Sequence, residues 1–210
     1  TVVLEAPQLT LAGDVVASTT DGRVILRTGA DFDAPEAGTA ITQTAGVIRT
    51  RDLSASRGDE IALTGNNEVT RLAAGAGVSA ASTDSIVLGA GGDFSFTDAV
   101  GGVQVAARVN AGTGSAVRVV ADGLSVAPAL SGTVFYAPGG VVRFLPFTAG
   151  ATIGLGGSGD TTNYAASLLQ RVQADRLVIG SADAGDVTLR QALDLTGANG
   201  PLALELHSGG

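Results

Sequence analysis

The stretch Ile61-Ala62-Leu63-Thr64-Gly65-Asn66-Asn67 decides the fold, because a short apolar strand runs directly into a sharp corner. Its alternation of apolar with small or polar residues has the period of a half-buried β-strand. Gly and Asn accept the positive-φ conformations of tight corners. The same apolar strand recurs along the chain at Val24-Ile25-Leu26, Ile86-Val87-Leu88, Val103-Gln104-Val105, Val117-Arg118-Val119, Leu177-Val178-Ile179, Val187-Thr188-Leu189 and Leu202-Ala203-Leu204.

This repetition predicts an all-β fold, a parallel β-helix or β-solenoid of short strands with Gly/Asn/Asp corners. The strands are too short, and the corners too sharp, for a meander sandwich with its longer hairpins. They suit a coil in which each strand pairs with its equivalent one turn above and below, with turns of roughly 20 to 25 residues. The alternative is an antiparallel β-sandwich repeat, which differs by pairing its strands as hairpins.

The composition favours a stacked core in a single domain over residues 1–210. The chain is 45% hydrophobic and has 31 glycines, but only six Phe, two Tyr and no Trp. A narrow stacked interior takes many small β-branched residues, whereas a globule of this size normally contains more large rings. The chain begins within a strand-like run and ends on Ser-Gly-Gly without a polar cap. We therefore expect it to be an internal part of a longer chain.

One segment departs from the strand pattern. Leu168, Leu169 and Val172 have helical spacing, and Asn163 precedes them as a candidate N-cap. We predict a short helix or turn over residues 163–173 on the outside of the coil.

Charge and cysteine content exclude several classes of partner and chemistry. The net charge is −8 and the sequence contains no lysine, which argues against nucleic acid, heparin-like polyanions and acidic membrane surfaces as partners. The absence of cysteine excludes disulfides and thiolate chemistry. No apolar run reaches membrane-spanning length, so we expect no membrane insertion.

Several stretches together resemble the repeats of large filamentous-haemagglutinin-like exoproteins of the two-partner-secretion type. They are Ile41-Thr42-Gln43-Thr44-Ala45-Gly46-Val47-Ile48, Leu53, Ile61 to Val69 and Leu72-Ala73-Ala74, then Phe147 to Gly156 and Leu177 to Thr188. The resemblance covers most of residues 40–206. It implies a right-handed parallel β-helix, secreted by a Gram-negative bacterium and held at the cell surface or released as an adhesin or fibre. The Asn-Pro motifs of the family's secretion domain are absent from this sequence.

Two short motifs point to binding sites but have simpler explanations. Arg57-Gly58-Asp59 has the form of a cell-adhesion tripeptide, yet Gly-Asp is the ordinary corner of this chain. The run 156–160, Gly-Gly-Ser-Gly-Asp, is similar to a calcium-binding coil motif, but its Asp falls one position early and no second copy follows in register. Asp31 and Asp33 are weak calcium candidates that fit a solvated loop better. We predict no metal site and no cofactor.

The sequence offers no catalytic constellation. A β-helix enzyme acting on polysaccharide would gather two or three carboxylates on one face. Asp59 and Glu60 are adjacent and would point to opposite faces of a strand. The single histidine, His207, has no evident triad partner and fits a solvent-facing rim. The other carboxylates that we considered occupy no common position of the repeat: Asp52, Asp84, Asp93 and Asp98.

Polar corner residues fit side-chain ladders between stacked turns. The residues with this role are Thr42, Thr44, Thr64, Asn66 and Asn67, whose side chains would satisfy one another and oppose slippage. The interior should be a dry apolar stack, with Val119, Ile153, Ile179 and Leu189 among the inward residues.

The sequence thus predicts a non-enzymatic structural module of a secreted bacterial adhesin or extracellular fibre. We expect it outside the cell or on the cell surface, self-associating end to end, with a host or neighbouring cell surface or a polysaccharide as a further partner. The alternatives are a β-helix carbohydrate-active enzyme or polysaccharide-binding module, and a calcium-stabilised coil.

Overall fold

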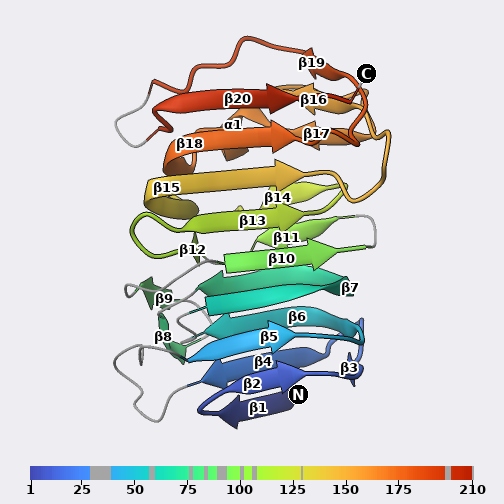
Figure 1. The fold of residues 1–210 in the computed structure, drawn as a ribbon, viewed down its shortest axis with the longest axis vertical. Coiled ribbons are helices and arrows are strands. Elements are labelled where there is room, and N and C mark those ends of the chain that lie inside the picture. The colour runs from blue at the N-terminus through green and yellow to red at the C-terminus, as the bar shows by residue number, and fades with distance from the viewer. Residues whose placement is uncertain are drawn as a thin grey trace.

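The computed structural model describes residues 1–28, 39–56, 60–75, 78–82, 85–88, 94–99, 102–105, 108–128, 130–196 and 200–209, and nearly all of its regular structure is β-strand (Figure 1). The strands of the first half are β1 (Val2–Ala6), β2 (Leu9–Leu11), β3 (Val15–Val16), β4 (Arg23–Thr28), β5 (Ala40–Gln43), β6 (Ile48–Ser56), β7 (Glu60–Gly75), β8 (Val78–Ser82), β9 (Ser85–Leu88) and β10 (Phe94–Asp98). Those of the second half are β11 (Val103–Val105), β12 (Val109–Asn110), β13 (Ala116–Val120), β14 (Leu124–Val126), β15 (Phe135–Leu145), β16 (Ile153–Leu155), β17 (Thr162–Tyr164), β18 (Val172–Gly180), β19 (Val187–Leu189) and β20 (Ala203–His207).

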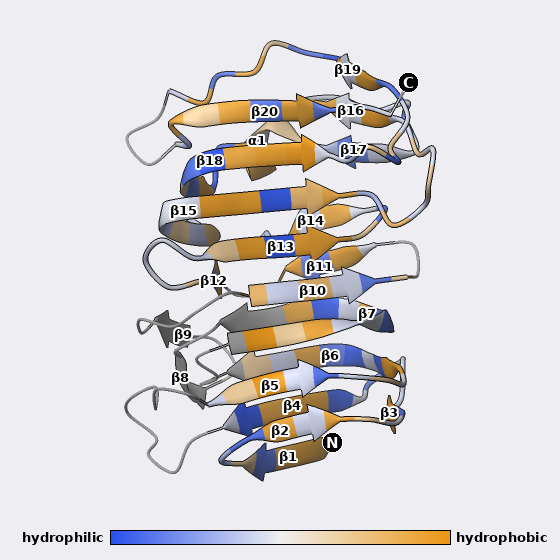
Figure 2. Ribbon diagram, viewed as in Figure 1, coloured by the Kyte–Doolittle hydropathy of each residue, from blue (hydrophilic) through white to orange (hydrophobic). Residues whose placement is uncertain are grey.

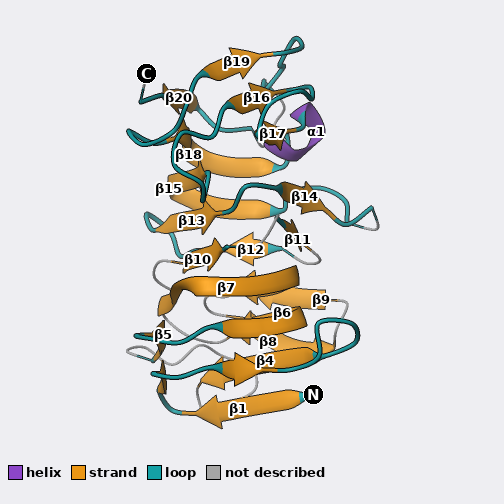
Figure 3. Cartoon of the chain, turned by 90° about the vertical axis from the view of Figure 1, so that its right-hand side faces the viewer, coloured by secondary structure: helices purple, strands orange, loops and turns teal. Residues whose placement is uncertain are grey.

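Most of these strands form one large parallel sheet, in the order β1-β4-β6-β7-β10-β13-β15-β18-β20 with further strands attached beside this path. Successive strands lie above one another along the long axis, from the N-terminus at one end to the C-terminus at the other (Figures 1 and 3). A three-stranded parallel sheet, β17-β16-β19, lies in the C-terminal part. The parallel pairing is the expected one, and it contradicts hairpin pairing for the strands of these two sheets.

A continuous column of apolar side chains runs through the stack. It joins eight strands in register: Leu9, Ile41, Ile61, Phe94, Val117, Val142, Leu177 and Leu204. We call this set the core column. Its six middle members are fully buried. Neighbouring members are separated by as few as 20 residues, from Ile41 to Ile61, and by as many as 35, from Val142 to Leu177, so the spacing is less regular than the sequence suggested.

Several strands are longer than the short strands that the sequence predicts, because they continue around corners. The first part of β7 pairs with β5 and β10, while its second part pairs with β6 and β11. In β15 the pairing with β18 shifts between Ala137 and Val141, where Gly139 has a φ of 68°. A glycine suits this position because its backbone accepts positive φ without steric cost. The corners therefore bend strands as well as ending them.

Alternation along each strand separates the core from the surface. In β13 the side chains of Val117 and Val119 are buried, while Arg118 between them is partly exposed. Figure 2 shows the result as largely hydrophobic strands with hydrophilic interruptions, for example in β15 and β20. Three of the predicted inward residues, Val119, Ile153 and Ile179, are buried, with exposures of at most 1%.

The prediction for Leu189 was wrong, since this side chain is 61% exposed. Leu189 lies in register with buried Leu155, but β19 is the outermost strand of its sheet. No further strand of the described chain covers it.

Two local predictions also need correction. Ile86-Val87-Leu88 lies in β9, which pairs with β8 in an antiparallel hairpin rather than in the parallel stack. The helix within residues 163–173 is α1 (Ala166–Leu169), a single turn whose Leu168 and Leu169 are buried. Its N-cap position is Ala165, whereas Asn163 belongs to β17, beside α1 in Figure 3. The described residues include no helix with the length and apolarity needed to cross a membrane.

Candidate functional site

The interior contains a ladder of polar side chains at one corner of the stack. The Asn67 Oδ1 atom accepts hydrogen bonds from the backbone N–H of Ile48 and from Gln43 Nε2, both at 2.9 Å. Asn67 Nδ2 donates to Gln43 Oε1 at 3.0 Å and to the Leu63 carbonyl at 3.1 Å. Asp98 lies in register with Asn67 and accepts the backbone N–H of Val69 at 2.9 Å. These buried groups bind backbone atoms of neighbouring strands, so their role is structural.

The predicted threonine and asparagine ladder is therefore only partly present. Asn67 belongs to it, while Thr64 and Asn66 are exposed. Thr44 Oγ1 donates to the Leu11 carbonyl at 3.2 Å, which links the levels of β5 and β2, two neighbouring levels of the stack. A level is one turn of the chain, which pairs with the turn above and below it. Gln43, which the sequence analysis passed over, is the main partner of Asn67.

Carboxylates at two other corners also bind the backbone of the next level. Asp14 Oδ1 accepts the N–H of Val47 at 2.9 Å. Asp122 Oδ1 accepts the N–H groups of Phe147 and Thr148, each at 2.9 Å. These carboxylates accept hydrogen bonds from corner N–H groups, which gives them a structural role in the stack.

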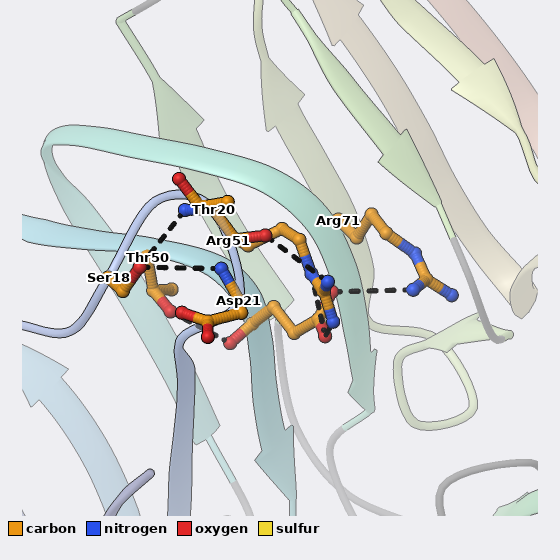
Figure 4. Close-up of polar contacts among 7 residues, drawn as sticks. Ser18, Thr20, Asp21, Thr50, Arg51 and Arg71 are labelled. Atoms are coloured by element: carbon orange, nitrogen blue, oxygen red, sulfur yellow. Dashed lines mark hydrogen bonds and ion pairs between the residues drawn. The ribbon is translucent and has the colours of Figure 1, made fainter.

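One lateral surface carries the carboxylate of Asp52 between two arginines, Arg51 and Arg71, and Figure 4 shows these two arginines. Arg51 Nη2 lies 2.7 Å from Asp52 Oδ2, and Arg71 Nη1 lies 3.5 Å from Asp52 Oδ1. Arg51 also donates to the Thr20 carbonyl at 3.2 Å. The hydrogen bond to Asp52 raises the pKa of Arg51. The carboxylate of Asp52 thus lies between two guanidinium groups, an arrangement of charge-assisted contacts.

A second lateral surface carries two arginines without such a partner. Arg118 of β13 and Arg143 of β15 lie directly opposite each other in the parallel register. Both are partly exposed, and the residues on either side of each are buried. Burial and the neighbouring charge of Arg143 lower the pKa of Arg118. We call these residues the arginine pair. The sequence does not reveal this neighbourhood, because the two positions lie 25 residues apart.

The Gly-rich run 156–160 forms a corner that is closed by an ion pair. Arg190 Nε lies 2.6 Å from Asp160 Oδ2, and Arg190 Nη2 lies 2.8 Å from Asp160 Oδ1. The hydrogen bond from Arg190 lowers the pKa of Asp160. Asn163, predicted as a helix cap, instead donates to the Asp160 carbonyl at 2.7 Å. Both carboxylate oxygens of Asp160 are thus engaged by Arg190.

The remaining candidates lie only in part within the described residues. His207 is half exposed, and its Nε2 lies 3.6 Å from Glu205 Oε2. Within the described part of the chain, no three His, Cys, Asp or Glu side chains gather as a metal site would require. The side chain of Glu60 is not described. Several candidates lie outside the described residues: Asp31, Asp33, Arg57-Gly58-Asp59, Asp84 and Asp93.

An open pocket lies at the C-terminal end of the stack, with a volume of about 430 Å³. Its lining comes from both β19 and β20 and the segments beside them: Asp186, Val187, Thr188, Leu206 and Ser208. Leu204 and Leu206, which continue the buried positions of Leu177 and Ile179, are 38% and 49% exposed. This end of the stack therefore presents core-type side chains to solvent.

Comparisons with protein-family models, with curated proteins and with solved structures find no match to this chain.

Proposed function

We propose that this chain is a right-handed parallel β-helix that acts as a non-enzymatic structural module of a secreted bacterial adhesin or extracellular fibre. The observation that carries the proposal is the core column, in which one apolar position continues through eight parallel strands. Stacked units that each contact only their neighbours build elongated rods and platforms. The handedness and the placement outside a Gram-negative cell rest on the resemblance to exoprotein repeats.

The proposed mechanism is mechanical. Backbone hydrogen bonds link each strand to those above and below it, and the core column excludes water between them. Corner side chains such as Asn67 and Asp122 add bonds that hold one level on the next. A shift of one level along its strands would break these corner bonds and move apolar residues to the surface. The polar ladder and the core column thus fix the register of the rod.

End-to-end self-association is the assembly that we propose. Among the described strands β20 pairs with β18 alone, and an open strand edge of this kind pairs readily with another chain. Leu204 and Leu206 would become buried beneath the next level, as Leu177 and Ile179 are buried beneath β20. The occupant of this end would be the first level of a second copy, where Leu9 and Leu11 occupy the equivalent positions of β2.

Electron microscopy of the protein from its natural source tests the fibre proposal. We expect rods or filaments whose diffraction shows a spacing of ~4.8 Å along the axis. Discrete short particles at all concentrations would contradict it.

Substitution at the C-terminal end tests the self-association. Leu204→Glu and Leu206→Glu should abolish concentration-dependent assembly in analytical ultracentrifugation, because a carboxylate would be buried between two levels. Leu202→Glu is the matched control, since Leu202 is 83% exposed and precedes β20. Assembly that survives the first two changes, or fails equally with the control, would contradict end-to-end stacking.

A polysaccharide-binding module is the second candidate function. The observation that favours it is the arginine pair on the surface of β13 and β15, where two cations lie side by side. A cell-surface fibre and a polysaccharide-binding module are compatible roles for one rod.

A further inference from the structure

The arginine pair lies on the outer surface of the stack, not inside it. Val117 and Val119 flank Arg118, while Val142 and Phe144 flank Arg143, and all four flanking side chains are buried. Side chains alternate between the two faces of a strand, so both guanidinium groups project from the opposite, lateral face. The two strands are direct neighbours in the sheet, which places the two backbone positions ~4.8 Å apart.

Within the described part of the chain, no carboxylate forms an ion pair with either arginine. The cross-strand neighbour of Arg118 on the other side is Ser95 of β10, and that of Arg143 is Val178 of β18. Beyond Val178, the neighbour in β20 is Glu205, which is already bound by Arg176 Nη1 at 2.9 Å.

The other lateral surface shows how this chain otherwise arranges its arginines. There Arg23, Asp52 and Arg71 follow one another in register, so that a carboxylate separates two cations. Like charges placed directly opposite each other destabilise a sheet. Partial burial lowers the pKa of Arg118, and the neighbouring charge of Arg143 lowers it further. A bound oxyanion would thus reduce the repulsion between Arg118 and Arg143.

The acidic character of the whole chain does not extend to this region. Residues 1–99 contain thirteen carboxylates and six arginines, whereas residues 100–210 contain seven carboxylates and six arginines. The half of the chain that carries the pair is therefore close to neutral, and an anion approaching it meets little long-range repulsion.

We propose that Arg118 and Arg143 bind the carboxylates of a linear acidic polysaccharide that lies along the axis of the stack. A guanidinium group matches a carboxylate with two parallel hydrogen bonds. A polyuronide carries one carboxylate on each sugar residue, and a sugar residue is similar in length to the spacing between neighbouring strands. Each arginine of the pair would then bind one uronate. A polyuronide brings fewer charges than a heavily sulfated polymer, which suits a chain whose net charge is −8.

The acidic-polysaccharide proposal rests on the second candidate function and not on the fibre function, because one chain contains both arginines. It adds a ligand class that the architecture alone does not identify. A failure of end-to-end assembly would leave the arginine pair intact, and a failure of polysaccharide binding would leave the rod intact.

Titration calorimetry with oligogalacturonate tests the proposal. The fully methyl-esterified oligosaccharide of the same length is the ligand control, because it keeps the sugars and removes the charge. Arg118→Gln and Arg143→Gln should each weaken oligogalacturonate binding about tenfold or more, as expected for loss of a charged hydrogen-bonding group. Arg23→Gln is the matched protein control, since Arg23 lies opposite Asp52 and should leave the affinity unchanged.

Several results would overturn the proposal. One is equal affinity of the wild-type protein for the charged and the esterified oligosaccharide, or no binding of either. Another is an equal loss of affinity with Arg23→Gln, which would indicate nonspecific attraction. Tighter binding of a sulfated oligosaccharide would overturn the assignment to carboxylates. Circular dichroism and melting at low salt separate binding from folding: Arg118→Gln should keep the fold and melt no lower than the wild type, because it removes a repulsion.

Discussion

Gln43 and Asn67 exchange two hydrogen bonds between neighbouring levels of the stack, from Gln43 Nε2 to Asn67 Oδ1 at 2.9 Å and from Asn67 Nδ2 to Gln43 Oε1 at 3.0 Å. Both side chains are buried. Asn67 Oδ1 is also the acceptor for the backbone N–H of Ile48. This pair therefore satisfies a corner whose backbone leaves the regular hydrogen-bonding pattern of the sheet.

Removal of the Asn67 amide should destabilise the protein strongly. Asn67→Ala leaves the Ile48 N–H and the Leu63 carbonyl without this partner, and each unsatisfied buried group costs about 1–3 kcal/mol. We expect the free energy of unfolding, measured by urea denaturation, to fall by about 2–4 kcal/mol. The neighbouring Asn66 is exposed, so Asn66→Ala should change it by no more than about 0.5 kcal/mol. Equal effects of the two substitutions would contradict the ladder.

Close approach of successive corners should make Gly46 far less replaceable than Gly150. The two have nearly the same φ, 76° and 75°, so alanine meets the same left-handed strain of about 1–2 kcal/mol at either position. At Gly46 an added Cβ would lie 2.3 Å from the carbonyl carbon of Gly13, whereas at Gly150 no atom lies within 4 Å. The structural shift needed to relieve that clash should lower the stability of Gly46→Ala by about 1–3 kcal/mol more than the strain alone.

The measurement is the unfolding free energy of Gly46→Ala and Gly150→Ala. We expect the unfolding free energy of Gly46→Ala to be lower than that of Gly150→Ala by the cost of the clash, because the left-handed strain is common to both variants. If both variants lost the same stability, the corners of Gly13 and Gly46 would not be stacked.

A charge placed inside the stack should unfold it, while the same charge at its end should not. Ile153 is fully buried in β16, and Leu189 of the neighbouring β19 is exposed. Ile153→Asp buries an unpaired carboxylate, so we expect a loss of more than about 4 kcal/mol and loss of the β-sheet signal in circular dichroism. Leu189→Asp should keep the signal and most of the stability. Tolerance of Asp at position 153 would show that the interior is not a dry core.

Local alternation allowed the inward residues to be predicted wherever a strand has neighbours on both sides. It identified Val119, Ile153 and Ile179 correctly, because the direction of a side chain depends on its position in its own strand. It failed for Leu189, since exposure there depends on whether another strand lies above β19. Burial at the end of a stack is not a local property of the sequence.

The contacts between side chains of neighbouring levels could not be predicted either, because they depend on which strands lie beside each other. Val117-Arg118-Val119 and Val142-Arg143-Phe144 share one pattern, an arginine between apolar residues, and this was the available signal for the arginine pair. The spacing between levels varies from 20 to 35 residues, however, so the pattern does not reveal which arginine lies beside which. Gln43 was missed in the same way, because its partner Asn67 is 24 residues away.

The ion pair between Asp160 and Arg190 should make stability depend on pH in the acid range. The hydrogen bond from Arg190 lowers the pKa of Asp160 in the folded protein below its ordinary value of 3.8. The folded state therefore holds this proton less tightly than the unfolded state does. The resulting stabilisation is complete above the unfolded pKa, and it is lost as the pH falls through the lowered folded pKa.

Asp160→Asn should accordingly lower the free energy of unfolding near neutral pH, and the difference from the wild type should shrink as the solution is acidified below about pH 4. Urea denaturation of both proteins across this range is the measurement. Asp175→Asn is the control, since Asp175 is exposed on β18 and should give a small difference at every pH. A difference for Asp160→Asn that stays constant into acid would mean that the neutral side chain serves as well as the ion pair, and the corner formed by residues 156–160 would then be held by its backbone geometry alone.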